Sequence, residues 1–310
     1  MSPALPSAEP VLLLSDLEHG SFPGTPLAVL GHPIGHSISP AMHNAALAGL
    51  AAVDPRFAGW KYHRFEIPPE QLPQALDLLH ARGFRGVNLT VPHKVLAFDR
   101  IAAVEPEARP VGAVNTLLRT EEGWRGYNTD GYGLAAAVRE DFGAGFAGAA
   151  VVILGAGGAA RGAAVECLRA GCSALWIANR TRANLDALLA GLAPAAPGIP
   201  RGGFEPGRPP AGLAPGAIVI NATKAGLSES DPAPADLSAL PRPRAVFDMI
   251  YNPPDTRLLV QARSLGIPCA GGLGMLVHQG AKALEIWTGI PSAQTAPVMR
   301  IAAARALAGP

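Results

Sequence analysis

The chain has 310 residues, of which 49% are hydrophobic and 16% charged, and its formal net charge at pH 7 is +1. This composition is typical of a globular protein long enough for two domains, and it excludes an intrinsically disordered chain. The small net charge gives no sign of a large basic surface for nucleic acid or anionic lipid.

The cysteines and histidines do not indicate a metal centre. Cys167, Cys172 and Cys269 are too few and too scattered for a disulfide framework or a four-ligand zinc site. The early histidines have no acidic or cysteine partner nearby in the sequence, so we predict no metal. Three free thiols suit a reducing compartment, and we expect a cytoplasmic protein. No apolar run of about 20 residues predicts a membrane span, and residues 1–10 lack the basic region of a secretory signal.

The first polar loop follows a predicted strand at 27–30 and reads GHPIGHSISPAMHN. Ser39 followed by Pro40 is a good helix start, with Ser39 as the N-cap. Capping alone would explain Ser39. Alternatively, the hydroxyls of Ser37 and Ser39, together with free N–H groups of the loop, would hold a small carboxylate.

A second polar cluster lies further along the chain. Hydrophobic periodicity predicts a strand, an amphipathic helix and a strand at 60–67, 72–82 and 84–89. Asn88, Thr90 and Lys94 lie at or just past the carboxyl end of the last strand, where α/β sheets place ligand groups. The helix dipole and partial burial would both favour the neutral form of Lys94, which suits a lysine that exchanges a proton. The alternative is a solvated surface lysine.

A predicted strand at 112–117 is followed by a turn at 121–123 and by GYNTDG, which leads into a helix. Asn128 and Asp130 could simply be turn and capping residues. Asp130 also precedes the cofactor motif described next, and its carboxylate could hold an ammonium group.

The strongest single motif is the stretch AAVVILGAGGAARG at 149–162. The apolar run is short, contains Val and Ile and ends at a glycine, so it predicts a buried parallel strand. Gly155 and Gly157 allow a tight turn, and Ala160 takes the third place of the G-x-G-x-x-G/A pattern. The exposed N–H groups of the following helix could then hold a pyrophosphate.

The next predicted strand, 173–178, ends in Asn179, Arg180 and Thr181. An NAD site usually has an acidic residue here, which binds the ribose 2′-hydroxyl. Arg180 can instead pair with a 2′-phosphate, so NADP is preferred over NAD. The alternative is an arginine that points to solvent.

The remaining predictions complete an alternating α/β pattern. The biased stretch 191–216 is expected to be a variable surface connection. Hydrophobic runs predict strands at 217–220 and 245–250. They also predict a helix at 257–264 and a separate last helix that continues through residue 287. Thr256 or Asp255 would begin the first of these helices. His278 and Gln279 are polar residues in the otherwise apolar last helix, and we expect one of them to face a cleft.

Together these segments resemble the shikimate dehydrogenase family. The matching blocks span roughly residues 27–290 in the family's order: GHPIGHSISPAMHN, NLTVPHK, GAVNT, GYNTDG, GAGGAARG, NRT, NATKAG, DMIYNPPDT and GMLVHQGAKALEIWTG. The first two blocks and GMLVHQ are much more specific than a glycine-rich loop.

The resemblance implies an α/β fold with two domains. An N-terminal α/β domain at 25–129 would bind the substrate, and a Rossmann-type doubly wound domain at 130–271 would bind NADP. C-terminal helices at 272–310 would return to the substrate domain. Residues 1–24 would be an extension, either loosely held or a short helix, with no assigned role.

The resemblance also implies an activity, the reversible reduction of 3-dehydroshikimate to shikimate by NADPH, and hence a small-molecule substrate. Lys94 would transfer the proton and Asp130 would be its partner. Residues matching the family's substrate contacts are Ser37, Ser39, Asn88, Thr90, Lys94, Asn115, Asp130, Tyr251 and Gln279. Those matching its cofactor contacts are Gly155, Ala156, Gly157, Gly158, Ala159, Asn179, Arg180, Thr181, Arg182, Met249, Gly272 and Met275.

The chain departs from the family pattern at two places. The family's second basic residue after NRT is replaced by Asn184, and Arg182 is the nearby substitute. Lys224 stands where a small or neutral residue is commoner. The alternatives are a quinate/shikimate dehydrogenase that uses NAD, or a non-catalytic relative. The absence of an acid after 173–178 argues against the first, and retention of both Lys94 and Asp130 argues against the second. The expected assembly is a monomer or a homodimer.

Overall fold

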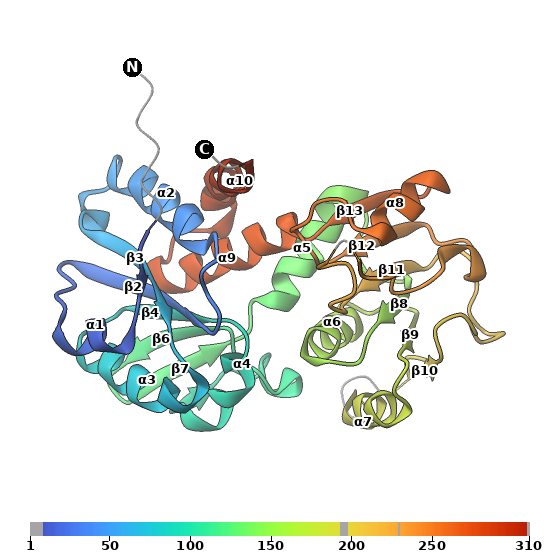
Figure 1. Ribbon diagram of the computed structural model, residues 1–310, viewed down its shortest axis with the longest axis horizontal. Coiled ribbons are helices and arrows are strands. Elements are labelled where there is room, and N and C mark those ends of the chain that lie inside the picture. Colours follow the sequence, from blue (N-terminus) through green and yellow to red (C-terminus); the bar gives the residue numbers. More distant parts are fainter. Residues whose placement is uncertain (1–8, 193–197, 229, 309–310) are drawn as a thin grey trace, which may run out of the picture. The chain divides into compact units, whose positions relative to one another are not determined.

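The computed structural model describes residues 9–192, 198–228 and 230–308. The chain forms two compact units, each built around its own sheet (Figure 1). Unit 1 contains the chain up to Thr129 and again from Gln279, and unit 2 contains Asp130–His278. No helix in the described ranges is long and apolar enough to span a membrane.

Unit 1 has a seven-stranded mixed sheet in the order β1-β3-β2-β4-β6-β7-β5. The first four strands of this order are parallel, β6 is antiparallel to both neighbours, and β5 pairs parallel to β7. The strands are β1 Val11–Leu12, β2 Thr25–Gly31, β3 Trp60–Glu66, β4 Gly86–Leu89, β5 Ala103–Val104, β6 Thr116–Thr120 and β7 Gly123–Tyr127. The helices within this unit are α1 Leu14–His19, α2 Ser39–Ala51, α3 Leu72–Ala81, α4 His93–Leu96 and α10 Ser292–Ala308.

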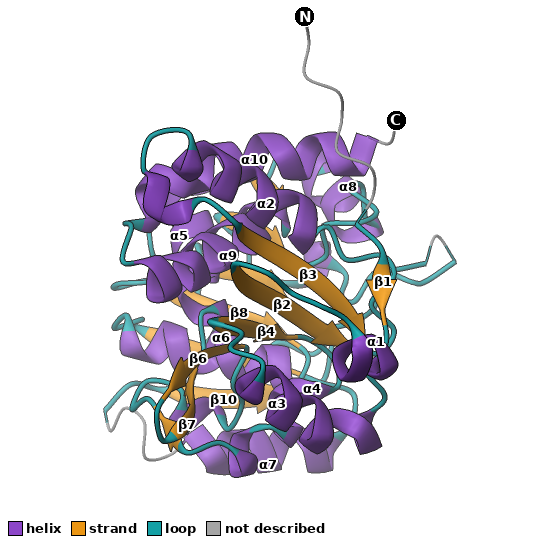
Figure 2. Cartoon of the chain, turned by 90° about the vertical axis from the view of Figure 1, so that its left-hand side faces the viewer, coloured by secondary structure: helices purple, strands orange, loops and turns teal. Residues whose placement is uncertain are grey.

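Alternation along the strands places side chains on both faces of this sheet. Ala28 and Leu30 of β2 join a buried cluster with α3 and with Leu17 of α1. On the other face, Tyr62 of β3 stacks on His43 of α2. Helix α10, from the far end of the chain, packs along α2 (Figure 2). The two helices lie on the Tyr62 face of the sheet.

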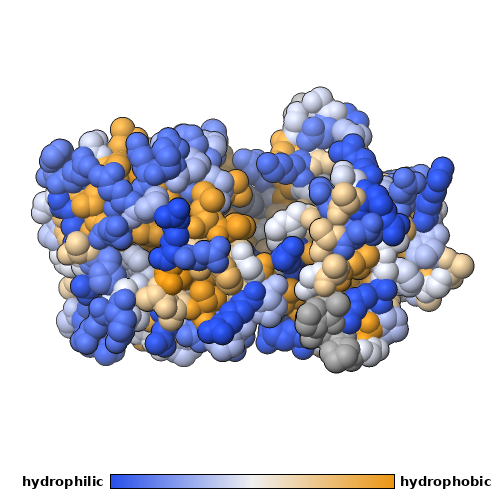
Figure 3. Space-filling view, turned by 90° about the horizontal axis from the view of Figure 1, so that it is seen from below, coloured by the Kyte–Doolittle hydropathy of each residue, from blue (hydrophilic) through white to orange (hydrophobic). Residues whose placement is uncertain are grey.

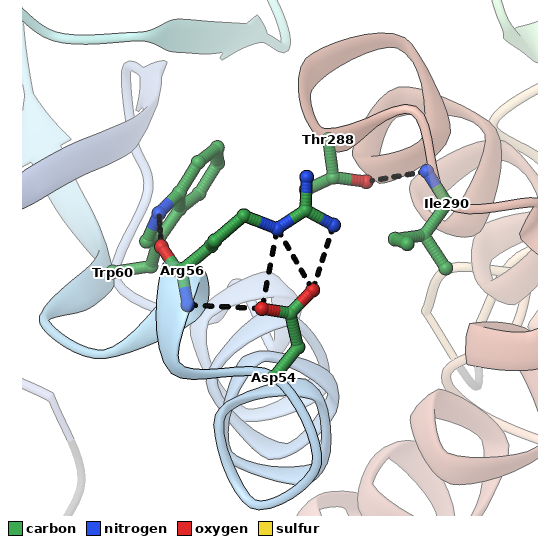
Figure 4. A network of polar contacts seen from close by, with 5 residues as sticks. All are labelled: Asp54, Arg56, Trp60, Thr288 and Ile290. Carbon is green, nitrogen blue, oxygen red and sulfur yellow. Dashed lines mark hydrogen bonds and ion pairs between the residues drawn. The ribbon is translucent and has the colours of Figure 1, made fainter.

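A short turn fixes the entry into β3. Asp54 caps the 3₁₀ helix Pro55–Phe57 by accepting the N–H of Arg56 at 3.0 Å, and the Arg56 side chain folds back onto the same carboxylate (Figure 4). The indole of Trp60 then donates to the carbonyl of Arg56 at 3.0 Å. These contacts set the start of a strand whose later side chains organise the candidate site.

Unit 2 has a six-stranded parallel sheet in the order β10-β9-β8-β11-β12-β13. Numbered within the unit this is 3-2-1-4-5-6, the order of dinucleotide-binding folds. The strands are β8 Ala150–Leu154, β9 Ala174–Ala178, β10 Arg201–Phe204, β11 Ile218–Asn221, β12 Ala245–Asp248 and β13 Cys269–Gly271. The helices are α5 Asp130–Phe142, α6 Gly158–Arg169, α7 Arg182–Leu192 and α8 Arg257–Ser264, and α9 Leu273–Thr288 continues from unit 2 into unit 1.

The α/β fold with a doubly wound sheet was predicted and is confirmed, with three local corrections. Helix α2 begins at Ser39 itself, with Ile38 at the N-cap position, so the capping role expected for Ser39 is wrong. The strand expected at 112–117 begins only at Thr116. The described part of the N-terminal extension contains the strand β1, which was not predicted, while α1 with its fully buried Leu17 confirms the short helix expected there as one alternative.

The stretch 191–216, expected to be a surface connection, contains the edge strand β10, although residues 193–197 lie outside the described part.

Hydrophobic and polar side chains are interspersed on the face of the molecule shown in Figure 3. The predicted N-cap at Thr256 is confirmed, since its hydroxyl accepts the N–H of Leu259 at 3.3 Å.

Candidate active site

In unit 1 the carboxyl end of β4 carries a buried network of amides and hydroxyls. Asn88 donates to the carbonyl of Asn115 and to the hydroxyl of Thr116, each at 3.0 Å. Its amide oxygen accepts the hydroxyl of Tyr62 at 2.7 Å. Both amide donors of Asn88 are therefore used within the protein, and only the remaining lone pair of its oxygen is left for a ligand.

Asn115 is the centre of the same network. Its amide oxygen accepts the N–H of Thr129 at 2.8 Å, and its amide nitrogen donates to the Thr129 hydroxyl at 3.0 Å and to Gln279 Oε1 at 3.3 Å. Asn88, Asn115 and Gln279, predicted separately from distant blocks, thus lie in one cluster. Nothing in the sequence pattern pointed to Tyr62, Thr116 or Thr129, and the contacts of Tyr62 and Thr116 with Asn88 join residues far apart along the chain.

Lys94 lies in the short helix α4 and is half-buried. Its backbone carbonyl accepts the N–H of Val114 at 2.9 Å, which places α4 beside the residue that precedes Asn115. Thr90 is anchored through its N–H to the carbonyl of Leu30 at 2.9 Å. Thr90 is therefore bonded to β2, and the backbone of Lys94 lies beside the segment that carries Asn115.

The loop between β2 and α2 carries Ser37, and Ser39 is the first residue of α2. Ser37 Oγ accepts the N–H of Ser39 at 3.4 Å, and the Ser37 N–H donates to the carbonyl of Ile34 at 2.9 Å. Both serines are half-buried.

Of the early histidines, His32 lies 3.2 Å from Glu66, an acidic partner that is distant from it in the sequence. His43 is instead fully buried, and burial lowers its pKa to about 3.

In unit 2 the glycine-rich turn lies where the strand order reverses. The N–H of Gly155 donates to Ala178, and the N–H of Ala222 donates to Leu154, so the turn is framed by β9 and β11. Gly155 has φ +109°, and a Cβ there would lie 3.0 Å from Thr223 Cγ2. Glycine is required at this position by both conformation and space.

The start of α6 is open above this turn. A Cβ built at Gly157 or Gly158 would meet no atom within 4 Å, and Gly157 is the N-cap of this 12-residue helix. The N–H groups and the dipole at the N-terminus of a helix of this length are suited to an anion. At Gly272, by contrast, a Cβ would lie 2.0 Å from the carbonyl of Met249, so these two predicted cofactor residues are in close contact.

The end of β9 presents the predicted 2′-phosphate group binders. Asn179 donates to the carbonyl of Thr181 at 2.8 Å, which shapes the turn, and Arg180 is exposed. Arg182, proposed as the second basic residue, forms an ion pair with Asp186 one turn along α7 at 2.9 Å. Its guanidinium is thus already engaged by a carboxylate.

The other predicted residues of unit 2 occupy the ends of nearby elements. Asp130 is the first residue of α5, and Met275 lies in the first turn of α9. Burial raises the pKa of Tyr251, which keeps its phenol protonated. Lys224 is exposed in the loop after β11. His278 pairs with Glu140 of α5 at 2.7 Å, whereas its neighbour Gln279 joins the amide network of unit 1.

The chain is similar to known proteins over most of its length. The shikimate dehydrogenase substrate binding domain matches residues 29–117, and the shikimate 5′-dehydrogenase C-terminal domain matches residues 272–300. A protein named shikimate dehydrogenase (NADP(+)) from Symbiobacterium thermophilum is 43% identical over 294 residues, covering 93% of this chain and 96% of the relative.

Two solved structures have the same fold. Shikimate 5-dehydrogenase from Thermus thermophilus, in complex with NADP(H) and shikimate, is 36% identical with a TM-score of 0.76, covering 90% of this chain and 100% of that chain. The ligand-free 5-ketofructose reductase of a Gluconobacter species is 32% identical with a TM-score of 0.77, covering 90% of this chain and 99% of that chain. One fold therefore occurs in proteins named for different substrates.

Proposed function

This chain belongs to the shikimate dehydrogenase family of oxidoreductases, and from that premise we propose that it catalyses the reversible NADPH-dependent reduction of 3-dehydroshikimate to shikimate. The observation that carries the proposal is the hydrogen-bonded cluster of Asn88, Asn115 and Gln279, which is linked to the lysine-bearing helix α4 through Val114. We further propose that unit 1 binds the substrate and unit 2 binds the cofactor, with the three free cysteines in keeping with a cytoplasmic location.

NADP fits the residues at the ends of β8 and β9. The open start of α6 suits a pyrophosphate, and Gly155 leaves no room for a side chain between the turn and Thr223. The exposed Arg180 follows β9 where an NAD site would carry an acid. When bound, the cofactor would supply the hydride, so the protein has to orient two ligands and manage one proton.

We assign that proton to Lys94. Its ammonium would protonate the oxygen of the ketone as the hydride arrives at carbon, and the neutral amine would accept the hydroxyl proton in reverse. Asp130 would be the partner that holds the ammonium and a neighbouring substrate hydroxyl. Ser37 and Ser39 would bind the carboxylate, and Thr90, Tyr251 and the amide cluster would bind the ring substituents.

The substrate and cofactor are tested by one kinetic matrix, in which shikimate and quinate are each oxidised with NADP⁺ and with NAD⁺. We expect the highest kcat/KM for shikimate with NADP⁺. A higher kcat/KM for quinate with NAD⁺ would contradict the proposal. The absence of turnover in all arms, and of NADPH oxidation with 3-dehydroshikimate, would indicate a non-catalytic relative.

The role of Lys94 is tested by Lys94→Ala. We expect turnover to fall by a factor of about 100 or more, because general acid–base catalysis is lost, while the shikimate Kd stays close to that of the unsubstituted chain. Lys282→Ala is the matched control, since Lys282 is likewise half-buried, forms an ion pair with Glu285 at 2.6 Å and has no assigned role in the reaction. Full activity of Lys94→Ala would remove the proposed role.

A further inference from the structure

Arg64 of β3 joins the N-terminal extension to the loop that carries the two serines. One terminal nitrogen, Nη1, donates to the carbonyl of Gly35 at 2.6 Å and to that of Ser37 at 3.2 Å. The other, Nη2, donates to the carbonyl of Glu9 at 2.6 Å. The Nε of Arg64 is buried and makes no hydrogen bond within the described ranges. A single guanidinium thus links three segments of unit 1.

The N-terminal segment 9–20, which we call the strap, is itself firmly attached to the sheet. Strand β1 pairs parallel with Arg64 and Phe65 of β3, and Leu17 of the strap is fully buried. At its far end, Arg82, the C-cap residue of α3, donates to the carbonyls of Glu18 and Gly20, the latter at 2.7 Å. The strap therefore offers Arg64 a fixed acceptor.

A second β3 side chain holds the other half of the same loop. Glu66 accepts the N–H of Ile34 at 3.1 Å and pairs with His32 at 3.2 Å. Because side chains alternate along a strand, Arg64 and Glu66 project from the same face of β3. The loop is thus fixed at two places. Two of its carbonyls accept hydrogen bonds from Arg64, and its Ile34 N–H and His32 side chain contact Glu66.

The arginine contacts set the direction of two peptide units. A peptide is planar and trans, so a carbonyl that faces Arg64 directs the N–H of the same peptide away from it. The N–H groups in question belong to His36 and Ile38, on either side of Ser37. Such N–H groups, together with serine hydroxyls, are the donors that bind a carboxylate.

We propose that Arg64 is a positioning residue for the carboxylate of the substrate, acting through the loop that carries Ser37 and Ser39 and itself held by the strap. This rests on the proposed function, in which the two serines bind that carboxylate. The strap, for which the sequence suggested no role, thereby becomes part of the support of the substrate site.

The test is Arg64→Met in the full chain, with Arg64→Lys as the milder variant. We expect Arg64→Met to raise the KM and the Kd for shikimate about tenfold or more, as displaced binding groups do. Turnover at saturating shikimate and the KM for NADP⁺ should stay within about twofold. Arg64→Lys should fall between the two, because lysine keeps the charge but lacks the planar fork of donors.

Arg82→Met is the matched control, because it removes the hydrogen bonds at the far end of the strap but leaves β1 paired with β3 beside Arg64, and it does not touch the loop. We expect it to lower the melting temperature and leave the shikimate KM unchanged. An unchanged shikimate KM in both Arg64 variants, or an equal rise in Arg64→Met and Arg82→Met, would overturn the proposal. Failure of the proposed function would appear separately, as absence of shikimate turnover by the unsubstituted chain.

Discussion

At the scale of single residues, the candidate substrate site depends on amides that are held by other side chains. Asn88 is buried, and its three hydrogen bonds fix which way its amide points. Burial raises the pKa of Tyr62 well above its usual value, so its hydroxyl remains a donor to Asn88 at any working pH. The Tyr62 hydroxyl uses one lone pair of the Asn88 oxygen. The second lone pair is then available to accept a hydrogen bond from a substrate hydroxyl.

Tyr62→Phe tests this contact. Removing the hydroxyl leaves a buried amide oxygen without its donor, and we expect the free energy of unfolding to fall by about 1–3 kcal/mol. A double-mutant cycle with Asn88→Ala isolates the pair, and urea unfolding should give a coupling energy of about 1 kcal/mol or more. Strictly additive effects of the two substitutions would show that the contact does not hold Asn88.

The same residues show what sequence patterns can and cannot predict about a site. Asn88 was predicted because polar residues at a strand end are conspicuous among apolar ones, whereas Asn115 was predicted only from the family resemblance. Tyr62 and Arg64 lie inside a strand and are unremarkable in sequence, since their partners are 26 or more residues away. Their roles follow from the pairing of β3 with β2, which brings the strand beside the loop after β2.

At the scale of elements, one buried carboxylate links the ends of β11 and β12 to α8. Asp248 accepts the side-chain amide of Asn221 at 2.9 Å, the N–H of Ile250 at 3.0 Å and the hydroxyl of Thr256 at 2.7 Å. Thr256 is also the N-cap of α8. Burial raises the pKa of Asp248, and these three donors act in the opposite direction.

Asp248→Ala should therefore destabilise the protein by about 2 kcal/mol or more, because three buried groups lose their acceptor. Asp236→Ala is a matched control. The exposed Asp236 also accepts three hydrogen bonds, from the N–H and hydroxyl of Ser238 and from Gln261. Thermal unfolding should show a clearly smaller loss for the exposed residue. Equal losses would mean that burial of Asp248 adds nothing.

The elements themselves were predicted where hydrophobic periodicity is strong, and missed where packing decides. Strand β10 reads Arg-Gly-Gly-Phe in a stretch rich in glycine and proline, which resembles a connection. Its glycines are required by its neighbours: a Cβ at Gly202 would lie 2.7 Å from Trp176, and one at Gly203 would lie 2.6 Å from Leu185. These contacts come from β9 and α7, and no local pattern encodes them.

At the scale of the whole molecule, unit 1 is completed by the two ends of the chain. The indole of Trp287 in α9 donates to the carbonyl of Leu117 at 2.9 Å and lies against Gly86 of β4, where a Cβ would be 2.1 Å from its nitrogen. The rings of Trp287, His43 and Tyr62 pack together. The stability of unit 1 therefore depends on a core assembled from three distant segments.

His43 makes that core sensitive to acid. Its ring is fully buried, neither nitrogen has a hydrogen-bond partner in the described part of the chain, and burial lowers its pKa from 6.5 to about 3. The unfolded chain therefore takes up a proton near pH 6.5 that the folded chain excludes. The contribution of His43 to stability is fully present above that pH and is lost as the pH falls below it.

Between pH 7 and pH 5 this linkage amounts to about 2 kcal/mol for one histidine. His43→Phe keeps an aromatic ring against Tyr62 and removes the titrating group, so its free energy of unfolding should fall by about 2 kcal/mol less over the same range. His63, whose pKa is lowered to about 4, is present in both proteins and cancels in the comparison.

Urea unfolding at the two pH values measures the difference directly, and a change in packing caused by phenylalanine affects both values alike. His19→Gln is the control, because the His19 side chain is 84% exposed and its removal should leave the pH dependence as it is. Parallel pH profiles for His43→Phe and the unsubstituted chain would show that His43 is not excluded from protonation in the folded state.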